Sequence, residues 1–179
     1  MNYAKIRKLD ITNGEGIGVS LFVQGCHFHC KNCFNKVTWD FDSGKQFTKD
    51  TLNTIISLLN DEHIKRFSIL GGEPLAKENI YDVLHTIIEI RKNVTDITIW
   101  VYTGYTFEEV KQLKYGKEIL DNVDTIVDGR YIDELRDLTL EFRGSSNQNI
   151  WKKINNVWVN TTDSLIPMGK PVGFSPQIT

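Results

Sequence analysis

The stretch GCHFHCKNCF, residues 25–34, directly follows the apolar run IGVSLFV at residues 17–23. The run is rich in β-branched and aromatic side chains and predicts a buried strand that ends before Gly25. The stretch after it holds Cys26, Cys30 and Cys33, the only cysteines of the chain. Three thiolates cannot complete a tetrahedral zinc site without a further ligand. They can hold three irons of a [4Fe–4S] cluster, which is normally bound by four cysteines, and leave the fourth iron open.

Two histidines inside the same stretch keep a second interpretation open. His27 or His29 could complete a mixed Cys/His zinc site, and three free thiols are a further possibility. The spacing lacks the paired C-x2-C knuckles that are usual in structural zinc sites. We therefore favour an iron–sulfur cluster held by a loop that wraps around it.

The composition indicates one domain with a tail, since the chain has 179 residues. Apolar residues make up 40% of it, enough for a core, and a formal net charge of −2 provides no basic field to attract nucleic acid. The apolar runs are shorter than the ~20 residues that span a bilayer, and the N-terminus lacks the apolar core of a signal peptide. The odd number of cysteines argues against a disulfide framework. We expect a cytoplasmic protein that binds neither nucleic acid nor membranes.

Hydrophobic periodicity predicts strands that alternate with helices. The expected strands are residues 17–23, 67–70, 97–102, 123–127 and 138–142, and the expected helices are residues 48–60, 79–91 and 106–114. Thr48 is expected to cap the first helix, and the run Thr106-Phe-Glu-Glu109 fits a capping box. Residues 150–154 and 157–159 flank Asn155-Asn156 and predict a hairpin with a two-residue turn. Residues 163–179 carry three of the four prolines and no periodicity, so we expect an irregular tail there.

Polar and glycine-rich segments follow the predicted strands. These segments are the cysteine loop, Gly71-Gly72-Glu73-Pro74, Thr103-Gly104, Asp128-Gly129-Arg130 and Arg143-Gly144-Ser145. Alternating strands and helices imply parallel βαβ units, in which ligands bind at the carboxyl ends of the strands. We therefore expect these segments to gather at one mouth. Gly71-Gly72-Glu73-Pro74 could be a tight turn only, or a place where the backbone approaches a ligand closely and Glu73 holds the geometry or pairs with a cation.

With these motifs in view, the chain resembles the radical S-adenosylmethionine enzymes. The resemblance rests on C-x3-C-x2-C after the first predicted strand and on Gly-Gly-Glu-Pro after the second. In that family the three cysteines hold [4Fe–4S], the open iron chelates S-adenosylmethionine, and the Gly-Gly-Glu-Pro segment contacts its methionyl amino group. The resemblance implies an α/β fold, a small incomplete (βα) barrel over residues 1–162, followed by the tail at 163–179.

The resemblance is closer to one branch, the glycyl-radical activases of anaerobic ribonucleoside-triphosphate reductases. It covers roughly residues 1–160. The segments that carry it are Asn2-Tyr3, Asp10-Ile11-Thr12-Asn13-Gly14, Phe22-Val23-Gln24-Gly25-Cys26, Cys33-Phe34-Asn35-Lys36, Trp100-Val101-Tyr102-Thr103-Gly104-Tyr105, Val127-Asp128-Gly129 and Arg143-Gly144-Ser145-Ser146-Asn147-Gln148. Two features depart from the pattern: Lys31-Asn32 stands where relatives often have a glycine before the third cysteine, and the tail has no counterpart.

This resemblance implies an oxidoreductase that activates a protein. One electron from the reduced cluster, supplied by a donor such as reduced flavodoxin, would cleave S-adenosylmethionine to methionine and a 5′-deoxyadenosyl radical. That radical would take a hydrogen atom from a glycine of the reductase. Two rivals stay open: a radical enzyme that acts on a small molecule or on another glycyl-radical enzyme, and a zinc-binding interaction module.

The resemblance also implies roles for individual residues. Cys26, Cys30 and Cys33 would be the cluster ligands, and Asn32 and Phe34, on either side of Cys33, would contact the adenine side of S-adenosylmethionine. Further candidate contacts are Gly71, Gly72 and Glu73 toward the methionyl end and Thr103, Asp128, Arg143 and Ser145 toward ribose or carboxylate. Each of the last four could instead cap a turn or form a surface pair, and Phe34 could be an ordinary core aromatic. We expect Asn13 and Gly14 to be structural, and Trp151 and Trp158 to pack across the hairpin rather than dock a partner.

Overall fold

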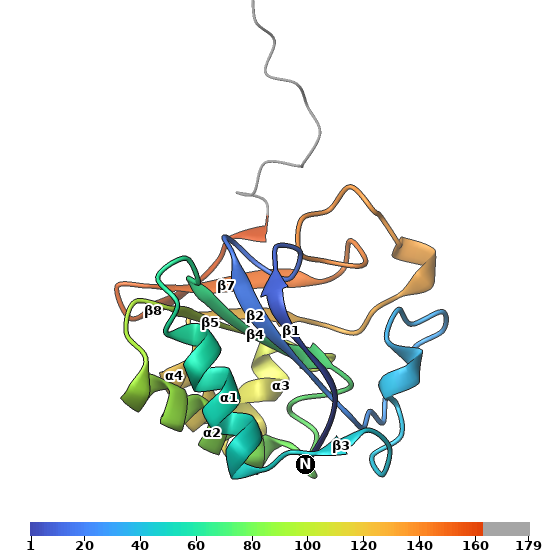
Figure 1. Ribbon diagram of the computed structural model, residues 1–179. Coiled ribbons are helices and arrows are strands. Elements are labelled where there is room, and N and C mark those ends of the chain that lie inside the picture. Colours follow the sequence, from blue (N-terminus) through green and yellow to red (C-terminus); the bar gives the residue numbers. More distant parts are fainter. Residues whose placement is uncertain (163–179) are drawn as a thin grey trace, which may run out of the picture.

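A mixed sheet of eight strands organises residues 1–162, the part of the chain that the computed structural model describes (Figure 1). The strand order is β3-β1-β2-β4-β5-β6-β7-β8. The strands are β1 (Asn2–Asp10), β2 (Gly18–Val23), β3 (Lys45–Gln46), β4 (Arg66–Gly71), β5 (Thr98–Tyr102), β6 (Thr125–Asp128), β7 (Asn149–Ile154) and β8 (Val157–Asn160). The α-helices of the same part are α1 (Lys49–Leu59), α2 (Ile80–Asn93), α3 (Phe107–Gln112) and α4 (Gly116–Asn122). The fold is therefore α/β, as predicted.

The four middle strands are parallel. β2 pairs with β4, β4 with β5 and β5 with β6, all in parallel register, whereas β1, β3, β7 and β8 are antiparallel additions at the two edges. The middle strands were all predicted, because strands buried on both faces are almost continuously apolar. Their carboxyl ends lie at one edge of the sheet, so the segments that follow them are neighbours, as the sequence predicted.

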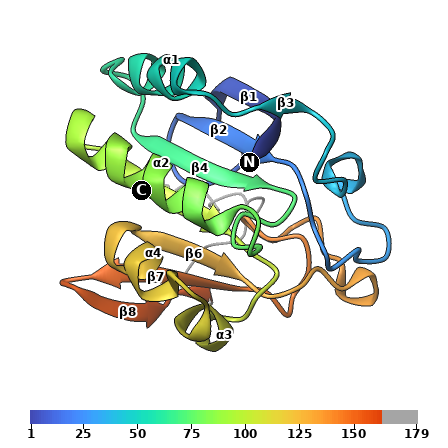
Figure 2. The same cartoon turned by 90° about the horizontal axis from the view of Figure 1, so that it is seen from below.

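The helices lie on one face of the sheet (Figure 2). Alternate residues of β2, namely Val19, Leu21 and Val23, belong to the core between that face and the helices. Thr48 and Thr106 cap α1 and α3, and both caps have the reciprocal hydrogen bonds of a capping box. These caps confirm the predicted helix starts. Within residues 1–162, no helix has the length and apolar character needed to cross a membrane.

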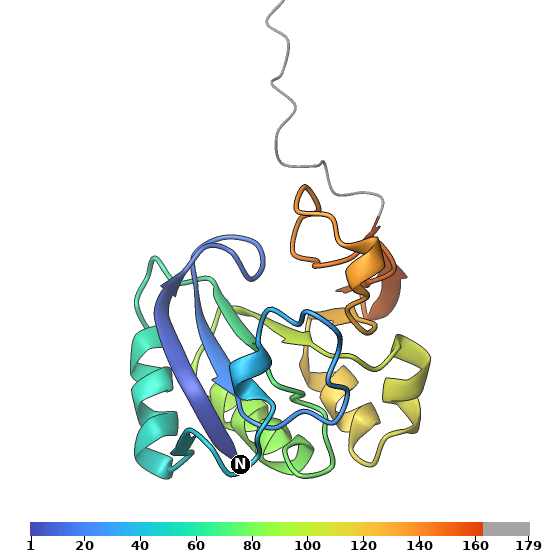
Figure 3. The same cartoon turned by 90° about the vertical axis from the view of Figure 1, so that its right-hand side faces the viewer.

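The opposite face of the sheet is curved and carries loops rather than helices (Figure 3). A small apolar cluster of Trp100, Val127 and Ile150 lies there, beside the buried side chain of Arg66. Arg66 donates hydrogen bonds to the backbone carbonyls of Gly14, Gly16 and Asp10, the last two at 3.1 and 2.8 Å. The loop 11–17 between β1 and β2 is therefore fastened across this face.

The expected strand at residues 138–142 is wrong. These residues form turns inside a long connection, residues 129–148, which joins β6 to β7 and which we call the strap. Leu138 is 74% exposed, Phe142 has a left-handed backbone (φ 56°), and Asp137 accepts hydrogen bonds from the backbone and hydroxyl of Thr139. The alternation of apolar and polar residues there lacks a partner strand to pair with.

Three other elements were not predicted: β1, β3 and α4. β1 lies between β2 and the two-residue edge strand β3, and its polar side chains Lys5 and Arg7 lie over the ring of Phe22, so its apolar pattern is weak. The predicted hairpin is confirmed as β7 and β8, and both turn residues, Asn155 and Asn156, have positive φ.

Candidate functional site

The three cysteines lie in a loop at the carboxyl end of β2. The base of the loop is closed by backbone hydrogen bonds from Gly25 to Thr38 (2.8 Å) and from Cys26 to Trp39 (3.0 Å). Cys26 is buried, whereas Cys30 and Cys33 are partly exposed, and all three are free thiols. The loop is thus a fixed element with its later cysteines toward solvent.

Backbone N–H groups point at each of the three sulfur atoms. Burial raises the pKa of Cys26, and the N–H groups of Phe28 and His29 oppose that shift. Burial and Cys33 raise the pKa of Cys30, which Arg130 and the N–H group of Tyr131 lower. The N–H of Asn35 donates to Sγ of Cys33 at 3.4 Å. Such hydrogen bonds stabilise thiolates and tune iron–sulfur clusters.

The donor set fits an iron–sulfur cluster by its chemistry. It offers three free thiols in one loop, each with N–H donors. Cys30 is near enough to Cys26 to raise the pKa of Cys26, and Cys33 is near enough to Cys30 to raise the pKa of Cys30. In residues 1–162, however, no three side chains of His, Cys, Asp or Glu already converge as a metal site. The side chains would therefore need to turn inward to hold a cluster.

The two histidines of the loop are engaged elsewhere. Nε2 of His27 lies 3.0 Å from a carboxylate oxygen of Glu78, and its ring packs on Phe41. The ring of His29 stacks on Trp39 with the centroids 4.5 Å apart. These contacts weaken the mixed Cys/His alternative, because both imidazoles already have partners.

Gly71 and Gly72 bring two strand ends into close backbone contact. Gly71 has φ 109°, and Gly72 donates a hydrogen bond to the carbonyl of Val23 at 2.9 Å. A Cβ at position 72 would lie 2.4 Å from the carbonyl oxygen of Gly25, directly before the first cysteine. Glycine is therefore required here for packing against the cysteine loop, whether or not a ligand also approaches.

Glu73 is buried, and its carboxylate joins the segment after β4 to the segment after β5. Its carboxylate accepts hydrogen bonds from the N–H of Leu75 (2.9 Å), the hydroxyl of Thr103 (2.7 Å) and the N–H of Gly104 (2.7 Å). Burial raises the pKa of Glu73 to about 7, although these three donors lower it. Of the two roles expected for Glu73, the contacts fit the one that holds geometry. Thr103 is buried with it, which favours the turn-capping alternative for Thr103.

Asp128 also binds its own neighbours. It accepts hydrogen bonds from the N–H of Phe107 (2.7 Å), from the backbone and side chain of Asn149 (3.1 and 2.9 Å) and from the indole of Trp151 (3.1 Å). It therefore fastens α3 and β7 to the end of β6. Trp151 and Trp158 both pack on Phe107 of α3, rather than on each other across the hairpin.

Arg143 and Ser145 belong to the strap and do not follow a strand. Arg143 donates to the carbonyl of Gln148 at 3.0 Å, and the buried hydroxyl of Ser145 accepts from the N–H of Ile132 at 3.2 Å. Both residues thus stabilise the strap by hydrogen bonds within it, in line with the turn-capping alternative to ligand binding.

Asn32 and Phe34 lie where the strap meets the cysteine loop. The side chain of Asn32 donates to Asp133 at 2.6 Å, and the ring of Phe34 packs edge-on against Tyr131. Phe34 is 57% exposed, so it is not a core aromatic. Both side chains are exposed, and both contact the strap.

Arg130 was expected at this mouth as part of a strand-end segment but was not singled out as a site residue. The guanidinium of Arg130 lies 4.4 Å above the ring of Phe28, near enough to Cys30 to lower the pKa of that thiol as described above. Its position directly after Asp128-Gly129, at a strand end, was the signal that could have identified it.

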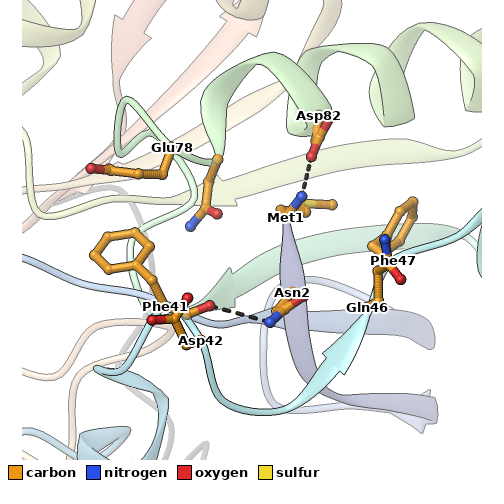
Figure 4. Close-up of a pocket in the computed structure, with 9 residues that line it drawn as sticks. Met1, Asn2, Phe41, Asp42, Gln46, Phe47, Glu78 and Asp82 are labelled. Carbon is orange, nitrogen blue, oxygen red and sulfur yellow. Dashed lines mark hydrogen bonds and ion pairs between the residues drawn. The ribbon is translucent and has the colours of Figure 1, made fainter.

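A surface pocket of about 610 Å³ lies beside the cysteine loop, since Phe41 and Glu78, which line the pocket, contact His27 of that loop (Figure 4). Met1, Asn2, Phe41, Asp42, Gln46, Phe47, Glu78, Asn79 and Asp82 line it. Its polar groups are partly paired with one another: the terminal amine of Met1 with Asp82, and the amide of Asn2 with the carbonyl of Phe41. No sequence-predicted site residue lines it, so we do not assign the function to this pocket.

Comparison with known proteins bears directly on the cysteine loop. Residues 12–151 match the model of the family described as a 4Fe-4S single cluster domain. An anaerobic ribonucleoside-triphosphate reductase-activating protein of Escherichia coli K12 is 41% identical over 150 residues, 83% of this chain and 96% of the relative. Proteins of the same name from Enterobacteria phage T4 and Vibrio cholerae are 37% and 39% identical, over 88% and 84% of this chain and 98% and 97% of their own lengths.

Proposed function

We propose a function from the premise that this chain belongs to the family of anaerobic ribonucleoside-triphosphate reductase-activating proteins and to the 4Fe-4S single cluster domain family. The chain holds a [4Fe–4S] cluster through Cys26, Cys30 and Cys33 and activates an anaerobic ribonucleoside-triphosphate reductase. The observation that carries the proposal is the loop of three free thiols, with N–H donors to each sulfur, at the carboxyl end of a parallel strand.

When bound, the cluster and S-adenosylmethionine supply the chemistry: one electron cleaves S-adenosylmethionine to methionine and a 5′-deoxyadenosyl radical, which takes a hydrogen atom from a glycine of the reductase. The protein supplies binding, orientation and exclusion of solvent. Glu73 holds the cysteine loop against the strand ends, because its N–H donates to the carbonyl of Gly25 and its carboxylate accepts from the N–H of Gly104, while Gly72 donates to the carbonyl of Val23. Arg130 supplies a positive charge beside the thiolates.

The candidate contacts to S-adenosylmethionine divide into two groups by burial. Asn32 and Phe34 are exposed at the mouth and can meet the ligand directly, together with the backbone of Gly71 and Gly72. The buried side chains of Glu73, Thr103, Asp128 and Ser145, and the partly buried Arg143, act by holding the loops that surround the ligand. The candidate residues therefore divide into those that touch S-adenosylmethionine and those that hold the surrounding loops in place.

The curved sheet is the small incomplete (βα) barrel of the radical S-adenosylmethionine type, formed by residues 1–162. Its support is the run of four parallel strands with helices on one face and loops on the other. An incomplete barrel leaves an open side through which a peptide of a protein substrate can enter. Reduced flavodoxin as the electron donor and a cytoplasmic location are further parts of this proposal.

The test combines the reduced, cluster-loaded chain with S-adenosylmethionine and an anaerobic ribonucleoside-triphosphate reductase. We expect a glycyl radical doublet in the EPR spectrum, and we expect none when the reductase is omitted or when its radical glycine is replaced by alanine. If 5′-deoxyadenosine instead forms with a small metabolite and the reductase gains no radical, the small-molecule rival is correct.

A further inference from the structure

The first part of the strap packs on the second half of the cysteine loop (Figures 1 and 2). Asn32 donates a hydrogen bond to Oδ2 of Asp133 at 2.6 Å. The rings of Phe34 and Tyr131 lie 5.2 Å apart. Nζ of Lys31 lies 2.7 Å from Glu134, but both side chains of that pair are well exposed. The strap therefore contacts the residues on both sides of Cys33.

Asn32 has an unfavourable backbone that needs support. Its φ of 53° lies in the left-handed region, between the ligand candidates Cys30 and Cys33. Asparagine tolerates this region better than most residues, yet surrounding contacts must maintain it. The hydrogen bond to Asp133 is the described side-chain contact that restrains Asn32.

Asp133 is itself held in place. Its other oxygen, Oδ1, accepts a hydrogen bond from the hydroxyl of Tyr131 at 2.8 Å, and that tyrosine packs on Phe34. One carboxylate therefore links the residue before Cys33 to the residue after it. Hydrogen bonds to a charged acceptor are stronger than neutral ones and fix direction as well as distance.

Hydrogen bonds within the strap restrain the segment that carries Asp133. The side-chain oxygen of Gln148 accepts from the N–H groups of Gly144 and Ser145 (2.8 and 3.2 Å), and its amide donates to the carbonyl of Gly129 at 2.9 Å. The amide of Asn147 donates to the carbonyl of Arg130 at 2.8 Å. The two ends of the strap are thus joined, so its first residues cannot swing freely away from the cysteine loop.

We propose that Asp133 is a positioning residue for the iron–sulfur site: it keeps Asn32 left-handed, so that the turn between Cys30 and Cys33 presents both thiols to one cluster. This inference rests on the proposed function, since it supposes a cluster at these cysteines. Groups that orient metal ligands without touching the metal commonly change metal affinity when they are replaced. Asp133 acts in this way, through Asn32.

The first experiment compares D133A with E134A, its neighbour in the strap. The readout is the half-life of the visible cluster absorbance when a chelator is added anaerobically to the reconstituted protein. We expect a loss about three- to ten-fold faster in D133A, because a charge-assisted hydrogen bond at a partly exposed position disappears. E134A breaks only an exposed ion pair and should stay within about two-fold of the wild type. Circular dichroism and the thermal midpoint check that both variants fold.

The second experiment separates positioning of Asn32 from any other effect of Asp133. Glycine adopts a left-handed backbone freely, so N32G keeps the turn without help, whereas N32A loses both the hydrogen bond and the tolerance for this conformation. We expect N32A to lose its cluster as fast as D133A, and N32G to stay within about two-fold of the wild type. In the N32G background, D133A should add no further effect, since contacting residues are not additive.

The outcomes distinguish the two proposals. A wild-type chain that binds no cluster overturns the proposed function, and this inference with it. A wild-type cluster whose half-life is unchanged in D133A overturns this inference alone. If D133A speeds the loss of the cluster equally in the wild-type and N32G backgrounds, Asp133 acts by another route, and this result also overturns the inference.

Discussion

The thiols and imidazoles of the cysteine loop differ in how they are engaged. Each cysteine is free and has N–H donors, whereas His27 pairs with Glu78 and His29 stacks on Trp39. A cluster held by three cysteines loses a ligand with any one of them, so C26A, C30A or C33A should abolish iron binding and S-adenosylmethionine cleavage. H27A and H29A should keep both.

Iron content and visible absorbance after anaerobic reconstitution measure this difference. A single cysteine variant with full iron content would remove that residue from the ligand set. Loss of metal in H27A or H29A would instead favour the mixed Cys/His zinc site, and metal analysis would identify zinc.

Glu73 makes stability depend on pH, because it is buried among donors at the strand ends. Burial raises its pKa from 4.5 to about 7. The folded chain therefore binds this proton more tightly than the unfolded chain. The stabilisation is fully present below about pH 4.5 and is lost as pH rises through about 7. At 1.36 kcal/mol per pKa unit, the change in the free energy of unfolding is at most about 3 kcal/mol.

Urea unfolding of the metal-free chain between these pH values tests this prediction. E73Q cannot titrate, so its free energy of unfolding should vary less with pH over the same range, while its absolute value should be lower because an amide cannot accept all three hydrogen bonds. An identical pH dependence in E73Q and wild type would assign the titration to another group.

Arg66 joins two elements that are separate in sequence, β4 and the loop 11–17. Its fully buried guanidinium binds carbonyls of that loop and lies 3.4 Å from the buried carboxylate of Asp10. The surrounding N–H groups of Thr12 and Asn13 also bind Asp10, and the pKa of Asp10 falls to about 2 although burial raises it. The carboxylate is therefore charged at neutral pH.

We expect R66M to lower the free energy of unfolding by about 3–5 kcal/mol, because it leaves the buried loop carbonyls without their donor and the buried charge of Asp10 with the half-exposed Arg7 as its remaining ion-pair partner. The double variant D10N/R66M should recover part of this loss, since it removes the buried charge. Chemical denaturation of the three proteins provides the measurement. A cost in R66M below about 1 kcal/mol would show that water or another group satisfies Asp10 and the loop carbonyls.

The elements that the sequence predicted correctly are those with a strong local signal. β2, β4, β5 and β6 are buried on both faces, and Thr48 and Thr106 mark their helices by their caps. β1 was missed because a strand that carries lysines and arginines, with only two-residue β3 beyond it, lacks an apolar pattern. The strand expected at residues 138–142 was wrong because strand formation depends on a partner, which local alternation does not reveal.

The same distinction applies to the site. The spacing of the cysteines and the position of Gly71–Pro74 after a strand were visible in the sequence. A structural role was expected as one possibility for both Glu73 and Asp128, but their main partners could not be identified, since Thr103 and Phe107 lie 30 and 21 residues away from them along the chain. The contact of Asp133 with Asn32 and the contact of Arg130 with Phe28 could not be predicted for the same reason, because each spans about 100 residues.

The molecule as a whole has one helix-covered face and one face of loops (Figures 2 and 3). The loop face is formed by the loop 11–17, the cysteine loop and the strap. An ion pair between Glu15 of the loop 11–17 and Lys152 of β7 links this loop to the strand next to the β8 edge of the sheet. The helix face provides most of the apolar core.

The expected irregular tail, residues 163–179, lies outside the described residues. The last described contacts tie residues 161 and 162 to β7: the N–H of Thr161 donates to the carbonyl of Ile150, and the hydroxyl of Thr162 accepts from its N–H, both at 2.8 Å. The match to the Escherichia coli relative covers 96% of that protein with 150 residues of this chain. The match therefore takes in almost all of the relative but only 83% of this chain.

We expect a chain truncated after Asp163 to keep most of its activating capacity, because the cut spares every described contact of the sheet, the cysteine loop and the strap. Glycyl radical yield per reductase, measured by EPR with full-length chain as the control, tests this expectation, and iron content shows whether the truncated chain still loads its cluster. A truncated chain with normal iron content but no radical yield would assign residues 164–179 a part in engaging the reductase. Loss of iron as well would place their contribution in the stability of the cluster-binding domain.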